Sequence, residues 1–156
     1  MNLIKLKMQD FRVYHGEHVV EFSNNIDKNV TIVHGENGIG KTTMLNAIKW
    51  CLYAKAPDFN ANGKPRKLLN NITNKVNEKK KFSVEIEFQE GDETYIATRE
   101  GTQNTSLGVA YPGNDRGLTL LKVDNTGSSN TIPNPQNIIN KILPEQLSDY
   151  FLFAGE

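Results

Sequence analysis

Cysteine, long apolar runs and net charge are what this 156-residue sequence has least of. The one cysteine, Cys51, cannot form an internal disulfide, which argues against a disulfide-stabilised secreted domain. No apolar run approaches the ~18 residues that a membrane-spanning helix needs, and no signal peptide is visible. Basic and acidic residues number 18 each, so overall charge indicates no particular partner. We therefore expect one cytoplasmic domain with a hydrophobic core and no membrane association.

A glycine-rich stretch carries the clearest chemistry in the chain. An apolar run of strand type, residues 30–33, leads into a turn, and a helix-patterned segment follows at residues 41–53. Between them lies the spacing Gly35-x4-Gly40-Lys41-Thr42, which is that of a phosphate-binding loop between a strand and a helix. We predict a nucleotide site with these members: Gly35, Gly38, Ile39, Gly40, Lys41, Thr42 and Thr43.

Each residue type in this loop suits a polyphosphate. Glycines allow backbone conformations that a side chain would forbid, so the amides of residues 38–43 can point inward at a helix N-terminus. Lys41 supplies a positive charge for the β- and γ-phosphates, and the Thr42 hydroxyl is placed to ligate Mg²⁺. The loop therefore predicts a nucleoside triphosphate and Mg²⁺ as ligands.

Hydrophobic periodicity predicts a mixed α/β fold. Alternation in residues 1–8 and 19–22 indicates a first hairpin across a turn at 11–16. The other expected strands are 30–33, which should be buried, 82–88 and 94–99 as a second hairpin, 109–111, 118–123 and an aromatic run at 151–153. Expected helices are 41–53, 137–143 and 144–150, with an exposed polar loop at 124–135.

The helix at 41–53 should pack on a sheet through residues at helical spacing. Those residues are Met44, Leu45, Ala47, Ile48, Cys51 and Leu52. Trp50 and Tyr53 are expected to pack at the edges of this face and to belong to the core, and core packing is also the expected role of Cys51.

Residues 54–81 form a basic region in a neutral chain. This region holds eight lysines and arginines against two acidic residues. One interpretation is a surface for nucleic-acid phosphates, with Lys79, Lys80 and Lys81 as possible DNA contacts. The other is a solvated connection rich in Asn, Gly and Pro.

Both ends of the chain resemble the heads of the SMC and double-strand-break-repair coiled-coil ATPases. The resemblance is carried by DFRVYH at 10–15, VVEF at 19–22, GENGIGKTT at 35–43 and LSDYFLFAGE at 147–156. The last of these is similar to the segment before the coiled coil in DNA-phosphorothioation (Dnd) ATPases and SMC-like anti-phage defence ATPases. The resemblance is weak between about residues 54 and 137.

The resemblance implies an ABC-type head, a P-loop NTPase fold with a mixed α/β core and an antiparallel β-lobe, split by a long coiled coil. Residues 1–156 would be its N-terminal lobe, ending where the coiled coil begins, as a truncation or as a chain completed by another. Asn37 would join the loop residues on the nucleotide, and Arg12 would reach the phosphates. Expected partners are the C-terminal lobe, a second head in a homodimer, double-stranded DNA and effector proteins.

Three features of the family are missing from this sequence. Relatives often carry a glutamine that touches Mg²⁺ and the attacking water where this chain has Ala154, and alanine cannot bind a metal. No apolar strand ending in Asp-Glu and no Ser-Gly-Gly signature is found, and in the family both lie after the coiled coil. The chain alone should therefore bind ATP weakly and hydrolyse it slowly or not at all.

Three functions remain open from the sequence. The first is the ATP-binding lobe of a DNA-processing ATPase in repair, DNA modification or anti-phage and plasmid defence, with ATP-driven head dimerisation coupled to DNA binding. The second is a self-contained P-loop kinase or GTPase, against which stand the missing acidic metal site and base-reading motif. The third is a non-catalytic nucleotide-binding module for regulation or assembly.

Overall fold

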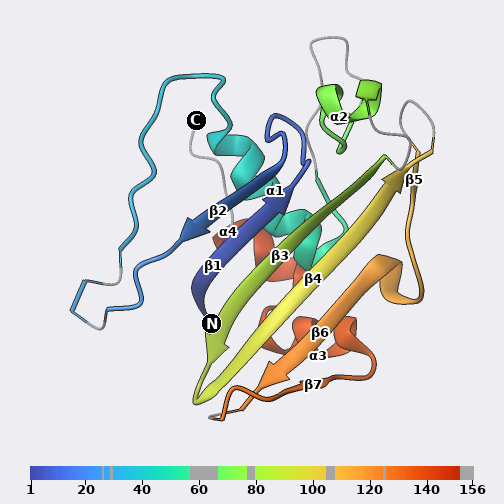
Figure 1. Cartoon of the computed structure of the whole chain (residues 1–156). Helices are drawn as coiled ribbons and strands as arrows, with labels where there is room; N and C mark the ends of the chain where they lie inside the picture. Colours follow the sequence, from blue (N-terminus) through green and yellow to red (C-terminus); the bar gives the residue numbers. More distant parts are fainter. Residues whose placement is uncertain are drawn as a thin grey trace.

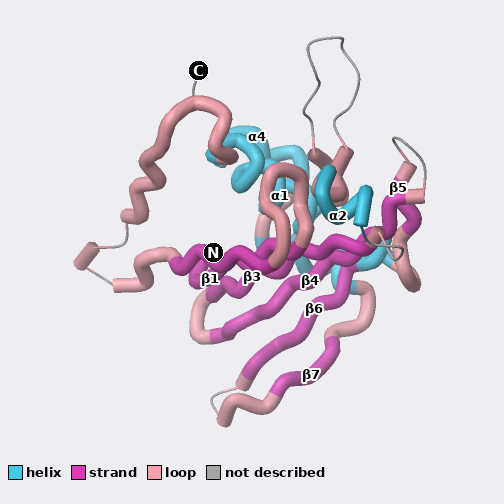
Figure 2. Tube along the Cα trace, turned by 45° about the horizontal axis from the view of Figure 1, so that its top comes forward, coloured by secondary structure: helices cyan, strands magenta, loops and turns pink. Residues whose placement is uncertain are grey.

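The strands of this protein form one antiparallel sheet, and the helices gather on one side of it (Figures 1 and 2). The structure is a computed structural model, and it describes residues 1–25, 27–28, 30–56, 67–76, 80–104, 108–124 and 126–151. None of the helices in these ranges is both long and apolar enough to cross a membrane.

Both predicted hairpins are confirmed. β1 (Asn2–Gln9) pairs with β2 (Glu17–Glu21), and β3 (Lys81–Glu90) pairs with β4 (Glu93–Gln103). The remaining strands are β5 (Val109–Ala110), β6 (Leu118–Val123) and β7 (Ser129–Thr131). The strand order is β2-β1-β3-β4-β6-β7, with β5 on β4, and each of these pairings is antiparallel.

The helices are α1 (Lys41–Tyr53), α2 (Asn71–Val76), α3 (Pro135–Ile142) and α4 (Ser148–Phe151), with 3₁₀ turns η1 (Asp115–Gly117) and η2 (Glu145–Leu147). α1 has the predicted bounds, and α3 starts two residues early because Pro135 suits a first helical turn. The helix predicted at 144–150 is divided between η2 and α4. The strand predicted at 151–153 is wrong for Phe151, because Phe151 is the last residue of α4. Residues 152–156 lie outside the described residues.

The polar loop expected at 124–135 is partly wrong, because β7 lies within it. β7 consists of Ser-Asn-Thr, which lacks the apolar alternation that predicts strands, and all three residues are exposed. It forms because β6 offers an open edge, on which Lys122 and Val123 pair with Asn130 and Ser129 of β7. Tertiary pairing therefore overrides a weak local preference here.

The two faces of the sheet differ in chemistry, as the alternation predicts. Inward-facing residues of β1, β3 and β4 are buried in one core, including Met8, Ile86 and Ala97, and β3 and β4 pack on α1. Outward-facing residues carry ion pairs such as Lys5–Glu87 at 3.1 Å and Lys7–Glu17 at 2.7 Å. Such exposed pairs add little stability, so burial on the α1 side holds the sheet together.

The core residues predicted on α1 are confirmed in large part. Ala47, Ile48, Cys51 and Leu52 are buried, while Met44 and Leu45 are half-buried against the core. Trp50 is fully buried, and its ring lies 5.1 Å from that of Phe82 and 5.5 Å from that of Phe11. Trp50 and Tyr53 are thus core residues, as expected.

Cys51 is buried too, and its one S–H proton lies within hydrogen-bond reach of the carbonyls of Val84 and Ala97. Burial raises the pKa of this thiol to about 12, so the thiol stays protonated and contributes to core packing, as expected.

The buried strand predicted at residues 30–33 is wrong. These residues have no regular structure, and Val30, Ile32 and Val33 are 73%, 85% and 44% exposed. A strand needs a neighbour to satisfy its backbone groups, and no strand among the described residues pairs with this run. In Figure 1 the segment after β2 runs away from the sheet before it returns to α1.

Arg99 joins four parts of the fold from inside the core. It is fully buried on β4, and its Nε donates to Cys51 O at 2.8 Å at the carboxyl end of α1. Its Nη1 donates to the carbonyls of Asp115 and Arg116 at 2.9 and 2.6 Å. Its Nη2 reaches Gln136 Oε1 on α3 at 3.0 Å. Because the last turn of α1 contains no basic residue, Arg99 supplies the positive charge that its exposed carbonyls favour.

Replacing Arg99 with methionine should destabilise the protein by about 3 kcal/mol, because the buried carbonyl of Cys51 and the carbonyls of η1 lose this donor. Thermal or urea unfolding measures this loss. The control is Glu100→Gln, a change of charge at an exposed position on the same strand. A loss from Arg99→Met no larger than that from the control would contradict the assigned role.

Candidate nucleotide site

The predicted phosphate loop leads directly into α1. Gly38 and Gly40 have φ angles of 88° and 120°, in the region that side chains disfavour. Gly40 is also tightly packed, because a Cβ there would lie 2.9 Å from both Tyr14 Oη and Val13 Cγ2. Glycine at position 40 is thus required both by the turn into the helix and by the neighbouring turn of the chain.

The N-terminus of α1 offers unsatisfied backbone donors. Gly40 is its N-cap and forms no side-chain cap, and the first turn contains no acidic residue. The first N–H groups of a helix have no partner within it, and together with the helix dipole they favour an anion. Lys41, Thr42 and Thr43 make up this turn, with Thr42 exposed and Thr43 buried. This donor set fits a phosphate group.

The Lys41 ammonium lies over the loop. Its Nζ donates to the carbonyl oxygens of Gly35 and Glu36, the latter at 2.8 Å. These contacts connect the start of the loop, at Gly35 and Glu36, to its end at Lys41. They also place a positive charge beside the N-terminus of α1. Asn37 and Ile39 are exposed on the same loop, and Gly35 is half-buried. The predicted residues between 35 and 43 therefore all lie in the loop and the first turn of α1.

The described residues offer little to a metal ion beyond the Thr42 hydroxyl. Within the described ranges, no group of three or more His, Cys, Asp or Glu side chains is placed to hold one. The hydroxyl fits Mg²⁺ as a single oxygen ligand, and that ion accepts a mixed set of water, phosphate and protein oxygens.

Arg12 lies in the turn between β1 and β2, at a φ of 51°. It is 7% exposed, and its Nη2 donates to Ala56 O, just beyond α1, at 3.1 Å. The same turn contacts the phosphate loop, because Tyr14 Oη donates to Gly40 O at 3.2 Å. The structure thus brings the turn to the loop, and the phosphate contact of Arg12 stays a prediction.

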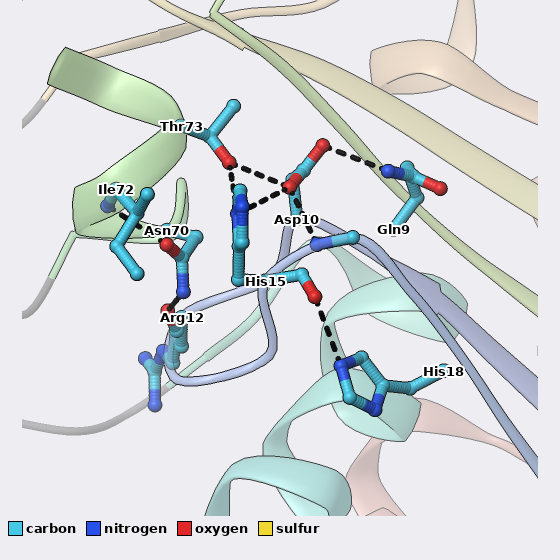
Figure 3. Close-up of polar contacts among 9 residues, drawn as sticks. Gln9, Asp10, Arg12, His15, His18, Asn70, Ile72 and Thr73 are labelled. Atoms are coloured by element: carbon cyan, nitrogen blue, oxygen red, sulfur yellow. Dashed lines mark hydrogen bonds and ion pairs between the residues drawn. The ribbon is translucent and has the colours of Figure 1, made fainter. Parts of the chain in front are cut away.

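Sequence reasoning missed a polar cluster behind this turn (Figure 3). Asp10, 8% exposed, accepts hydrogen bonds from Thr73 Oγ1 at 2.5 Å, Gly16 N at 2.8 Å and Gln9 Nε2 at 2.8 Å. Burial raises the pKa of Asp10, and these donors together with the nearby His15 outweigh it, so the pKa lies below its ordinary value. Asn70 is a preferred residue before a helix and could have indicated where α2 begins, but no local pattern links it to Asp10.

The described lysines of the basic region are exposed or half-buried. Lys75 in the last turn of α2 and Lys81 at the start of β3 are exposed, and Lys80 is half-buried with a φ of 44°. Lys55 forms an ion pair with Glu145. Lys79 lies outside the described residues, as do residues 57–66 and Ala154.

Comparison with known proteins identifies the family. The model of the family described as an AAA domain, AAA_23, matches residues 5–155. The DNA double-strand break repair Rad50 ATPase of Thermoplasma acidophilum is 27% identical over 126 residues, which is 81% of this chain and 12% of that protein. The protein of the same description from Methanococcus maripaludis is 26% identical over 144 residues, 85% of this chain and 13% of that protein.

A solved SMC head domain from Thermotoga maritima matches with a TM-score of 0.48 and 22% identity, over 90% of this chain and 42% of that chain. This chain spans only 12% and 13% of the length of the two Rad50 ATPases that it matches. The narrower resemblance to phosphorothioation and defence ATPases stays a prediction. The chain belongs to the AAA_23 family of AAA domains, and its predicted resemblance to double-strand-break-repair ATPases is confirmed.

Proposed function

We propose that this chain is the ATP-binding N-terminal lobe of an SMC-like coiled-coil ATPase head that acts on DNA. The observation that carries this proposal is the uncapped N-terminus of α1, entered through Gly40 and flanked by Lys41. Backbone donors, a helix dipole and an ammonium group converge there, which is the chemistry that a triphosphate requires.

In this role Lys41 exchanges its contacts with the Gly35 and Glu36 carbonyls for oxygens of the β- and γ-phosphates. The Thr42 hydroxyl binds Mg²⁺, which neutralises phosphate charge when it is bound. Asn37 and Ile39 lie on the exposed rim of the loop and contact the nucleotide from there. Arg12 adds a fixed positive charge from the neighbouring turn.

The exposed apolar run at residues 30–33 supports the proposal that a C-terminal lobe completes the fold. Val30, Ile32 and Val33 have strand-type side chains, yet they are exposed, as is Ile39 at 55%. Exposed apolar residues this close together mark a contact surface. A strand from the second lobe would satisfy the backbone of this run and bury these side chains.

Hydrolysis on this proposal needs parts outside the chain. The second lobe supplies the carboxylates for Mg²⁺ and water, and a second head caps the γ-phosphate. ATP then joins two heads and hydrolysis releases them, which couples nucleotide state to the DNA-binding surface. The exposed Lys75 and Lys81 support a DNA contact on the basic region. The chain serves repair, DNA modification or defence in the cytoplasm.

Lys41→Ala in the full protein should weaken ATP binding at least tenfold and abolish ATP-dependent head pairing, because the loop loses its ammonium group. Titration with a fluorescent ATP analogue and sedimentation measure the two effects. Lys28→Ala, at an exposed position away from the loop, is the matched control. Unchanged ATP affinity in Lys41→Ala would sink the assignment, and binding without any turnover in the wild type would favour a non-catalytic module.

Charge reversal at Lys80 and Lys81 should weaken binding to double-stranded DNA and lower its salt dependence, by about one unit of slope for each DNA phosphate that the variant no longer neutralises. Binding is measured at several salt concentrations. The control reverses two exposed lysines outside the basic region, Lys28 and Lys141. Equal effects in the two double variants would show that residues 54–81 are only a solvated connection.

A further inference from the structure

The turn at residues 10–16 is held between two parts of the protein. On one side it contacts the phosphate loop, through Tyr14 Oη on Gly40 O at 3.2 Å and through Val13. On the other side it lies against residues 68–73, which lead into α2. Asp10 and Arg12 both have positive φ angles, 53° and 51°, which non-glycine residues adopt at some cost. External contacts must therefore fix this conformation.

Asn70 supplies the first set of these contacts with its backbone and side chain. Its N–H donates to Asp10 O at 2.8 Å, and its Nδ2 donates to Arg12 O at 2.6 Å. Its Oδ1 accepts from Ile72 N at 2.8 Å at the start of α2. Asn70 is 5% exposed, so these bonds are sheltered from water. One buried amide thus fixes both the entry of α2 and the two strained residues of the turn.

Thr73 supplies the second set. It is 2% exposed, and its hydroxyl donates to Asp10 Oδ1 at 2.5 Å. A hydroxyl has one proton, so Thr73 Oγ1 accepts from His15 Nδ1, which lies 3.0 Å away. Figure 3 shows Thr73, Asp10 and His15 converging, with the Arg12 side chain on the other side of the turn. A hydrogen bond to a buried carboxylate is among the stronger ones in proteins.

We infer that Asp10, Asn70 and Thr73 are positioning residues of the nucleotide site, which hold the 10–16 turn against Gly40 and thereby join ATP binding to α2. The inference rests on the proposed function. None of the hydrogen bonds described for these three side chains reaches the phosphate loop, so their effect on the loop passes through Tyr14 and Val13. Since α2 lies within the basic region, nucleotide binding is connected in this way to residues 67–76 of that region.

The test is Thr73→Val in the full protein, which keeps the shape of the side chain and removes the hydroxyl. ATP affinity should fall roughly tenfold, the usual size for losing a hydrogen bond to a charged group. Thr73→Ser should restore affinity to within about twofold. Thr98→Val is the matched control, since Thr98 also bonds a carboxylate, Glu85 at 3.3 Å, on the opposite face of the sheet. Wild-type affinity in Thr73→Val, or an equal loss in Thr98→Val, would overturn the inference.

A second measurement needs no variant of the cluster. In the wild-type protein, ATP should slow amide hydrogen exchange at Arg12, Gly16 and Asn70, whose N–H groups donate to Leu68 O, Asp10 Oδ1 and Asp10 O. Lys41→Ala should remove this protection. Protection of residues 38–43 without any change at the three cluster amides would refute the inference and leave the proposed function intact. Absence of protection at the loop itself would refute the proposed function.

Discussion

A single buried guanidinium sets the relative positions of the elements that make this fold. Arg99 leaves the middle strand of the sheet and bonds the carboxyl end of α1, the carbonyls of η1 and Gln136 of α3. Burial lowers the pKa of Arg99, and the surrounding carbonyls compensate a charge that would otherwise be costly. Because these bonds fix the carboxyl end of α1 on the sheet, they also help to fix its N-terminus, where the phosphate loop leads into the helix.

The sheet and α1 then define where the loop lies, and the 10–16 turn defines its shape. Trp50 packs among Phe11 and Phe82, so the first residue after the Asp10 bend is anchored in the same core as α1. Gly40 has room for no side chain because Val13 and Tyr14 occupy that space. The site is thus built from segments far apart in sequence, and its geometry depends on hydrophobic packing as much as on its own glycines.

Local patterns predicted the parts of the fold whose neighbours lie close in sequence. The hairpins β1–β2 and β3–β4, helix α1 and the loop residues 35–43 follow from alternation, helical spacing and one motif. The polar cluster could not be predicted, because Asp10 and Thr73 are 63 residues apart and meet only after the sheet has formed. β7 could not be predicted either, since pairing with β6 and not its own composition makes it a strand.

The buried strand predicted at residues 30–33 is absent for a different reason, which bears directly on the phosphate loop that follows it. The residues Val-Thr-Ile-Val favour a strand locally, but a strand exists only with a partner, and the described residues provide none. On one side, the phosphate loop is therefore supported by α1. On its other side, the run at residues 30–33 pairs with no strand among the described residues. A second lobe that pairs with this run would order the loop from both sides. ATP binding should then be tighter in the assembled head than in this lobe, because the cost of ordering the loop would already be met by the pairing.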